Sequence, residues 1–210
     1  MFSIKTSDPG ALEKAADILL HNGVAIIPTD TVYGLAAHPA FPGAVARLQT
    51  LKARENPKPV ALLIDAPETL PRFVKDLPDC AARLAKRYWP GPLTLVLDTP
   101  GGTEGFRVPN HDFCRALLAR CGGALRVTSA NLTGQLPATS AAAALEALGL
   151  TAELLLDDGD SPGGVASTVI KVAGASCSQE SANTTMGAGC SRYICLREGA
   201  IPFAECLESQ

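Results

Sequence analysis

The sequence lacks the features of membrane and exported proteins. None of its apolar runs approaches the length needed to span a bilayer, and the first residues, MFSIKTSDPG, lack the basic-then-apolar pattern of a signal peptide. Charged residues make up 19% of the 210 positions and apolar residues 47%, a balance typical of an ordinary globular protein and unlike that of a disordered chain. We therefore expect a cytoplasmic protein without a membrane partner.

An excess of positive charge is also missing. The formal net charge is −3, so no overall basic field would attract nucleic acid. A local basic pocket remains compatible with this balance. The length suits one domain with a substantial core, and we expect residues 1–210 to form a single domain.

Cysteine pairs with metal-site spacing are absent. No two of the seven cysteines stand in a C-x-x-C arrangement, and their number is odd. Without an export signal, reduced thiols are the expectation. The cysteines are Cys80, Cys114, Cys121, Cys177, Cys190, Cys195 and Cys206.

The common catalytic arrangements are missing as well. The three histidines, His21, His38 and His111, are far apart in the sequence, and no Ser-His-Asp pattern or metal-ligand cluster is visible. Residues 99–105 form a glycine-rich connector that lacks the GxxxxGK[ST] pattern of a P-loop. If the protein is an enzyme, positioning and charge neutralisation should dominate over a dedicated base.

The stretch GVAIIPTDTVYGLA at residues 23–36 is the most informative part of the chain. Its first half, residues 24–27, is a β-branched and apolar run closed by Pro28, which predicts a buried strand. Three hydroxyl side chains and a carboxylate follow, and Gly34 then gives the backbone freedom. Loops at strand ends often hold ligands, but such a turn can also serve only its own backbone groups.

Helices and strands are predicted along the whole chain. Apolar stripes and helix-start signals predict helices at residues 9–22, 42–53, 67–77, 79–89, 112–120 and 141–148. Apolar runs predict further strands at 60–64, 93–97, 106–109, 125–128, 154–156, 167–172 and 193–196. Residues 174–191 are rich in Ser, Ala, Gly and Thr, which predicts a flexible surface loop.

Several predicted strands end in hydroxyl, amide or basic side chains. Arg107 lies within an apolar strand, so it either faces solvent or points into a polar cavity. Cations combined with small hydroxyl groups suit an anionic ligand, most commonly phosphate. The set comprises residues 29–33, Arg107, residues 129–131, residues 167–168 and Arg197, with Lys52, Arg54 and Lys58 nearby in the sequence.

The same stretches resemble the YrdC-type threonylcarbamoyl-adenylate synthases, in their short, single-domain form. Seven segments occur in the family's order from about residue 24 to 201: PTDTVYGLAAHP, LKARENPKPVALLI, YWPGPLTLVL, FRVPNH, VTSANLTG, STVIKV and LREGAI. The resemblance implies an α/β fold, a twisted mixed sheet with surrounding helices and a deep central cavity.

The resemblance also implies a nucleotidyltransferase. Its substrates would be L-threonine, bicarbonate and ATP, and its products threonylcarbamoyl-adenylate and pyrophosphate. The product serves the N6-threonylcarbamoyl modification of adenosine in tRNA, and short forms are expected to pass it to a separate transferase complex. Mg²⁺ would be held mainly by the ATP phosphates, since no carboxylate cluster is visible in the sequence.

Site residues follow from the matching motifs. The resemblance implies that Lys52 and Arg54 neutralise the phosphates during catalysis and that Thr31, Arg107 and Ser167 surround the threonine substrate. The nucleotide-binding set implied by the resemblance is Lys52, Arg54, Lys58, Thr103, Ser129, Asn131 and Arg197.

The sequence departs from the family pattern at three places. Leu63 stands where some members have histidine, and Lys171 stands where an acidic residue or Asn is common. The segment between residues 174 and 191 is also longer than expected.

Two other functions fit the same residues. The first is a YrdC-like module that binds tRNA or double-stranded RNA without chemistry, and the second is a paralogue acting on another nucleotide or acyl acceptor. Salt-dependent RNA affinity without ATP consumption would indicate the RNA-binding module.

Overall fold

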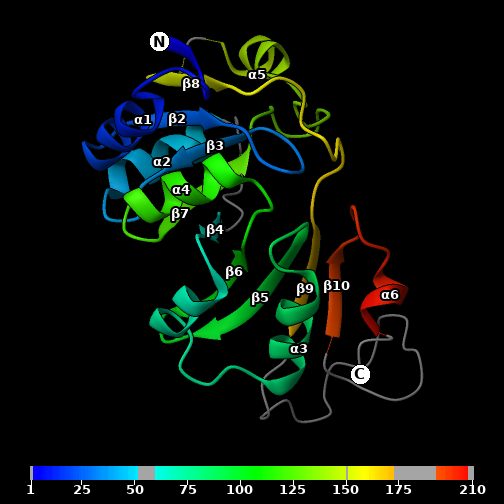
Figure 1. The fold of residues 1–210 in the computed structure, drawn as a ribbon. Helices are drawn as coiled ribbons and strands as arrows, with labels where there is room; N and C mark the ends of the chain where they lie inside the picture. Colours follow the sequence, from blue (N-terminus) through cyan, green and yellow to red (C-terminus); the bar gives the residue numbers. More distant parts are fainter. Residues whose placement is uncertain (1, 52–59, 150, 173–192, 208–210) are drawn as a thin grey trace.

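The computed structural model describes residues 2–51, 60–149, 151–172 and 193–207. In this part of the chain the strands form a ten-stranded mixed sheet in the order β1-β8-β2-β3-β7-β4-β6-β5-β9-β10 (Figure 1). The α/β class with a twisted mixed sheet, expected from the resemblance, is confirmed. That all 210 residues form one domain stays a prediction.

The described part of the chain contains ten strands and six α-helices. The strands are β1 (Phe2–Lys5), β2 (Val24–Ile27), β3 (Gly34–Ala37), β4 (Ala61–Ile64), β5 (Leu93–Thr99), β6 (Gly102–Arg107), β7 (Ala124–Ser129), β8 (Leu154–Asp157), β9 (Thr168–Val172) and β10 (Tyr193–Arg197). The helices are α1 (Ala11–Leu20), α2 (Pro42–Thr50), α3 (Asp79–Tyr88), α4 (Asp112–Arg120), α5 (Ala141–Leu148) and α6 (Phe203–Leu207), with a 3₁₀ helix η1 (Pro67–Arg72).

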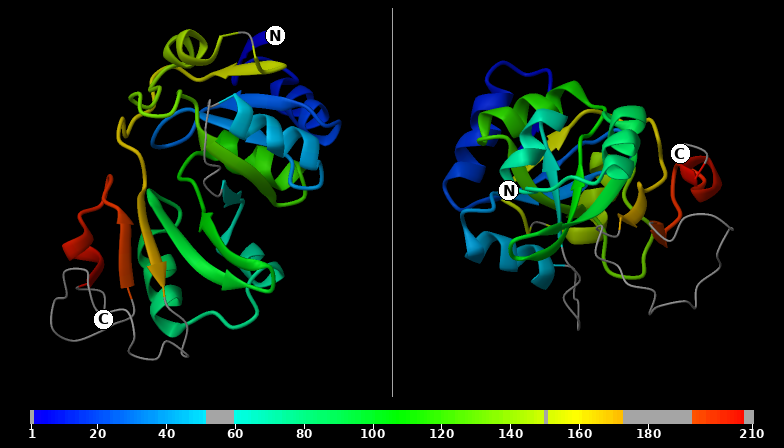
Figure 2. Two further views of the ribbon diagram at one scale, coloured as in Figure 1. Left: turned by 180° about the vertical axis from the view of Figure 1, so that it is seen from behind. Right: turned by 90° about the horizontal axis from the view of Figure 1, so that it is seen from below.

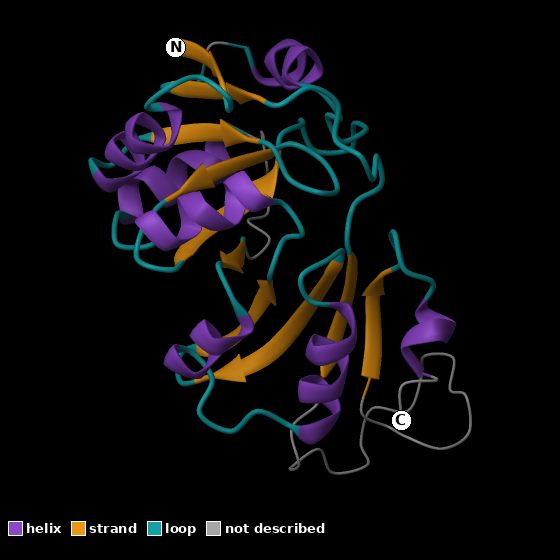
Figure 3. Ribbon diagram, viewed as in Figure 1, coloured by secondary structure: helices purple, strands orange, loops and turns teal. Residues whose placement is uncertain are grey.

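Helices cover both faces of the half of the sheet that contains β2, β3 and β8 (Figures 2 and 3). On β2, Ala25 and Ile27 pack with α1 and α4 on one face, while Val24 and Ile26 pack with α2 and α5 on the other. A strand buried on both faces needs apolar residues at every position, because successive side chains point to opposite sides. This explains the uninterrupted apolar run VAII.

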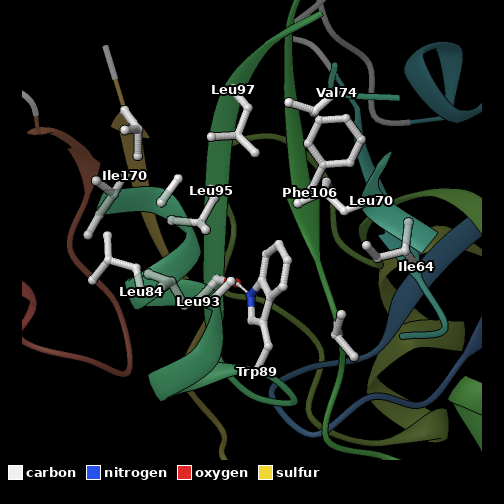
Figure 4. Close-up of a cluster of buried hydrophobic side chains, with 14 of the residues drawn as sticks. Ile64, Leu70, Val74, Leu84, Trp89, Leu93, Leu95, Leu97, Phe106 and Ile170 are labelled. Carbon is white, nitrogen blue, oxygen red and sulfur yellow. Dashed lines mark hydrogen bonds between the residues drawn. The ribbon is translucent and has the colours of Figure 1, made fainter. Parts of the chain in front are cut away.

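In the other half of the sheet, formed by β4, β6, β5, β9 and β10, one face packs into an apolar core. Leu93, Leu95 and Leu97 of β5 point into a core that includes Trp89 and Phe106 (Figure 4). The Trp89 indole donates a hydrogen bond to the Leu93 carbonyl at 2.7 Å, which satisfies its polar atom inside this core. The intervening β5 residues face the opposite side, and that side is where a cavity lies.

Three expectations about local structure are wrong, and one strand was not predicted. The helix expected at residues 67–77 is the short 3₁₀ helix η1, which ends at Arg72. Residues 99–105 are not a connector: β5 and β6 pair through them as an antiparallel hairpin, with Thr99 opposite Gly102. Gly34 does not supply flexibility, since it begins β3 and a Cβ there would lie 2.5 Å from Val127 Cγ1. The first strand, β1, was not predicted because it is short and largely exposed and pairs only with distant β8.

Other expectations fall partly within the described residues. The five described cysteines, Cys80, Cys114, Cys121, Cys195 and Cys206, carry free thiols. Cys177, Cys190 and the segment 174–191, predicted to be a flexible loop, lie outside the described residues. None of the described helices combines the length and apolar character that crossing a bilayer requires.

Candidate functional site

A cavity of about 590 Å³ lies against the face of the sheet that is opposite the Trp89 core. Successive side chains of a strand point to opposite faces of the sheet. Leu93, Leu95 and Ile170 therefore point into the core, and their neighbours on the same strands line the cavity. The polar and charged residues that line it are Thr29, Thr31, Tyr33, Thr94, Thr103, Arg107, Thr128, Ser129, Ser167, Lys171 and Arg197.

The charge of this lining has one sign. Arg107, Lys171 and Arg197 are its charged side chains, and no carboxylate side chain is among the described lining residues. Hydroxyl groups from several strands surround these cations. Cations with neutral donors in a partly enclosed space bind anions such as carboxylates and phosphates. The cavity is therefore suited to an anionic ligand.

The β2–β3 loop supplies two threonines with different tasks. The Thr29 hydroxyl donates to the Val32 carbonyl at 2.6 Å and accepts from the Thr31 backbone N–H at 3.2 Å. Thr29 thus stabilises the loop itself, as a local turn would predict. The Thr31 hydroxyl instead accepts a hydrogen bond from Arg107, 76 positions along the chain, at 2.9 Å. The loop therefore serves both its own backbone and the cavity.

Arg107 points into the cavity and is only 7% exposed. Its Nε donates to the Gly91 carbonyl at 3.0 Å, one terminal nitrogen donates to Thr31, and the other forms an ion pair with Asp30. Burial lowers the pKa of this guanidinium, and the negative charge of Asp30 opposes that effect. A guanidinium carries five N–H donors, so the three contacts leave two for a ligand.

Ser167 connects β9 to two neighbouring strands. Its hydroxyl lies 2.9 Å from the Thr94 hydroxyl on β5 and accepts a hydrogen bond from Arg197 on β10 at 3.1 Å. The Ser167 carbonyl accepts two more hydrogen bonds from the same guanidinium, at 2.8 and 3.1 Å. Burial and, to a smaller extent, the positive charge of Arg107 lower the pKa of Arg197. A bound anion would relieve this repulsion between the two guanidinium groups.

The structure brings most of the predicted site residues together. Thr31, Thr103, Arg107, Ser129, Ser167 and Arg197 all line the one cavity. Asn131 does not line it: the residue is buried, and its side-chain amide donates to the Leu132 and Gln135 carbonyls at 3.0 and 2.7 Å. Lys52, Arg54 and Lys58 lie outside the described residues. The roles given to all of these residues stay predictions.

Sequence reasoning missed four polar contributors to the cavity. Thr94, Thr128 and Lys171 line it, and the Gly91 carbonyl fixes the orientation of the Arg107 guanidinium. Strand alternation could have found Lys171, because it is four residues after Ser167 and therefore on the same face of β9. Nothing in the sequence signals a backbone carbonyl.

No protein site for a metal ion is visible in the described part of the chain. No three His, Cys, Asp or Glu side chains gather there in an arrangement that could hold a metal ion. His111 instead caps α4 by accepting a hydrogen bond from the Cys114 N–H at 3.3 Å. Carboxylates, common protein ligands of Mg²⁺, are missing from the described lining residues.

Comparison with known proteins gives consistent matches. The family model Sua5_yciO_yrdC, described as telomere recombination, matches residues 17–179. The chain is 36% identical to the threonylcarbamoyl-AMP synthase of Idiomarina loihiensis over 169 residues, covering 73% of this chain and 88% of the relative. It is also 36% identical to the Pyrococcus abyssi threonylcarbamoyl-AMP synthase over 166 residues, covering 74% of this chain and about half, 49%, of that longer relative.

Solved structures give the same match. The Pyrococcus abyssi Sua5 protein complexed with L-threonine superposes with a TM-score of 0.86 at 28% identity, covering 100% of this chain and 61% of that one. Escherichia coli YciO shares the fold with a TM-score of 0.76 at 23% identity and 94% coverage of each chain. On the family match and the relatives above 30% identity, this chain belongs to the Sua5/YciO/YrdC family.

Proposed function

We propose that this protein synthesises L-threonylcarbamoyl-adenylate from L-threonine, bicarbonate and ATP, with release of pyrophosphate. The observation that carries the proposal is a cavity that combines cations, clustered hydroxyl groups and no described carboxylate. Relatives that carry the name threonylcarbamoyl-AMP synthase, and a Sua5 structure with L-threonine, support the same activity.

The threonine substrate would bind at the Arg107 end of the cavity. Two N–H donors of Arg107 remain for the substrate carboxylate, because its other three donors are used by Gly91, Thr31 and Asp30. The hydroxyls of Thr31 and Ser167 also line the cavity and can bind the substrate hydroxyl. These contacts fix the position of the amino group before the reaction.

The proposed chemistry has two steps. The threonine amine attacks CO2 derived from bicarbonate, forming a carbamate and losing a proton. A carbamate oxygen then attacks the α-phosphorus of ATP, and the bond from that phosphorus to the pyrophosphate oxygen breaks. Lys52, Arg54 and Arg197 would neutralise charge on the phosphates, with Lys58, Thr103 and Ser129 as further nucleotide contacts.

Two further groups have supporting roles in this proposal. Mg²⁺ bound to the ATP phosphates would supply additional charge neutralisation. Asn131 would act by holding the turn after β7, because both of its amide hydrogen bonds close that turn. Asn131 is therefore proposed as a positioning residue for Ser129.

The proposed product is used for the N6-threonylcarbamoyl modification of tRNA. A cytoplasmic location and a separate transferase complex that receives the product belong to the same proposal. Direct binding of tRNA or double-stranded RNA would need a local basic surface, because the net charge of the chain is −3.

Pyrophosphate release by the purified protein tests this function. The assay contains ATP, Mg²⁺ and bicarbonate, with L-threonine, L-serine, L-valine or no amino acid. We expect threonine-dependent release with an AMP-linked product, and weak activity with valine, which lacks the hydroxyl. ATP binding without release would favour another acceptor, and RNA binding without ATP binding would favour the RNA-binding module.

Substitution of the basic segment tests the nucleotide site. Lys52→Ala and Arg54→Ala should abolish turnover because each removes a charge that stabilises the leaving pyrophosphate. Circular dichroism and the unfolding midpoint should remain those of the parent protein. Full activity in either variant would show that these residues do not neutralise the phosphates.

A further inference from the structure

We propose that Lys171 binds the phosphate chain of the nucleotide, on a different strand of the cavity wall from the proposed carboxylate site at Arg107. This inference rests on the proposed function and adds a binding residue to it. Three observations carry it: the direction of the Lys171 side chain, the absence of a protein partner in the described residues, and its place along β9.

The direction of the side chain follows from the pleat of β9. Ile170 and Val172 point into the apolar core, whereas Ser167, Val169 and Lys171 line the cavity. Lys171 is paired with Val96 of β5 on one side and Ile194 of β10 on the other, so its register is fixed by two strands. A slip of one residue would place a lysine in the apolar core, which strongly disfavours any other register.

The three cations of the cavity differ in how they are used. Arg107 is held by Asp30, Thr31 and Gly91, and Arg197 by Ser167. Lys171 makes no ion pair or side-chain hydrogen bond with any described residue, although it lies on the cavity wall. An ammonium group that has three donors and no acceptor among the described residues is suited to an anionic ligand.

Its position separates Lys171 from the amino acid end. Four strand residues place its Cα about 13 Å from that of Ser167. On the neighbouring strands the ladder runs from Lys171 to Val96 and on to Gly105, which is two residues from Thr103 and two residues from Arg107 on β6. Lys171 is therefore two strands away from the strand that carries the proposed carboxylate site, and the phosphate chain of the larger substrate, the nucleotide, is the anion proposed for it.

Calorimetric titration with ATP and with adenosine tests the proposal, without threonine or bicarbonate present. The variants are Lys171→Met, which keeps the length of the side chain and removes the charge, and Lys171→Arg, which keeps the charge. Lys86→Met is the matched control, because Lys86 is exposed on α3 and does not line the cavity.

We expect Lys171→Met to weaken ATP binding about tenfold, the loss of one charge-assisted hydrogen bond, and to leave adenosine binding unchanged. Lys171→Arg should retain most of the ATP affinity, and Lys86→Met should retain all of it. Unchanged ATP affinity in Lys171→Met, or an equal loss for adenosine, would overturn the role of Lys171. A parent protein that fails to bind ATP would instead overturn the proposed function, and with it this inference.

Discussion

The ion pair between Arg107 and Asp30 offers a sharp test of how the cavity is built. Both side chains are less than 10% exposed, at 8% and 9%, and the pair joins β6 to the loop after β2. Replacing Arg107 by Met keeps much of the side-chain volume but leaves the Asp30 carboxylate buried without its cation. Removing one partner of a buried pair costs about 3–5 kcal/mol of unfolding free energy.

The loss should be much smaller when both charges are removed. In the double variant Asp30→Asn with Arg107→Met, no charge is left buried, because Asn is neutral and close in shape to Asp. We expect the two changes to be non-additive, with a coupling free energy of about 2 kcal/mol. Urea unfolding of the parent, both single variants and the double variant gives this value directly.

Measuring L-threonine affinity in the same variants distinguishes an effect on stability from an effect on substrate binding. The double variant should regain stability yet fail to bind L-threonine, because the two remaining guanidinium donors are lost with Arg107. Strictly additive losses of stability would refute the assignment of Asp30 as the partner that Arg107 neutralises. Threonine affinity unchanged in the double variant would refute Arg107 as the carboxylate site.

Two further predictions concern stability. A Cβ at Gly199 would lie 2.2 Å from a backbone oxygen, so Gly199→Ala should lower the unfolding free energy by about 1–3 kcal/mol. Gly101→Ala is the control, because a Cβ at Gly101 would have no atom within 4 Å, and it should leave the unfolding free energy unchanged. Equal urea midpoints for the two variants would contradict this prediction. Burial raises the pKa of Cys114 to about 12 and that of Cys121 to about 11. Unfolded thiols lose their protons above about pH 8.5 while the folded ones keep them, so stability should fall by up to about 1.4 kcal/mol per pH unit per thiol above that pH. Urea unfolding above about pH 8.5 should show the unfolding free energy falling with pH, and the fall should be less steep in Cys114→Val. An unfolding free energy that does not change with pH would contradict this prediction.

Local sequence patterns were sufficient for most of the elements. The run VAII predicted β2, and the alanine-rich run after Ser140 predicted α5. The structure adds that the Ser140 hydroxyl accepts a hydrogen bond from the Ala143 N–H at 3.1 Å. The β5–β6 hairpin was misread because its second strand begins with glycine and threonine and is exposed there. An exposed strand lacks the apolar run that would predict it from sequence, because its stability comes from pairing with its neighbour.

The sequence also indicated part of the site. A basic residue inside the apolar strand FRVP indicated either a solvent-facing Arg107 or one in a polar cavity, and the resemblance linked it to Thr31 and Ser167. The structure decides for the cavity, because the Gly91 carbonyl, Thr31 and Asp30 surround the guanidinium.

The sequence by itself determined the class of fold, the family and the residues that carry positive charge and hydroxyl groups. Only the tertiary structure decided which of them meet. Thr31 and Arg107 are 76 positions apart, and Lys171 reaches the same cavity from β9, whose partner β5 lies more than 70 positions earlier in the chain. The physical reason is that the facing of a side chain follows a local period of two residues, whereas the order of strands in a sheet follows from the packing of the whole chain.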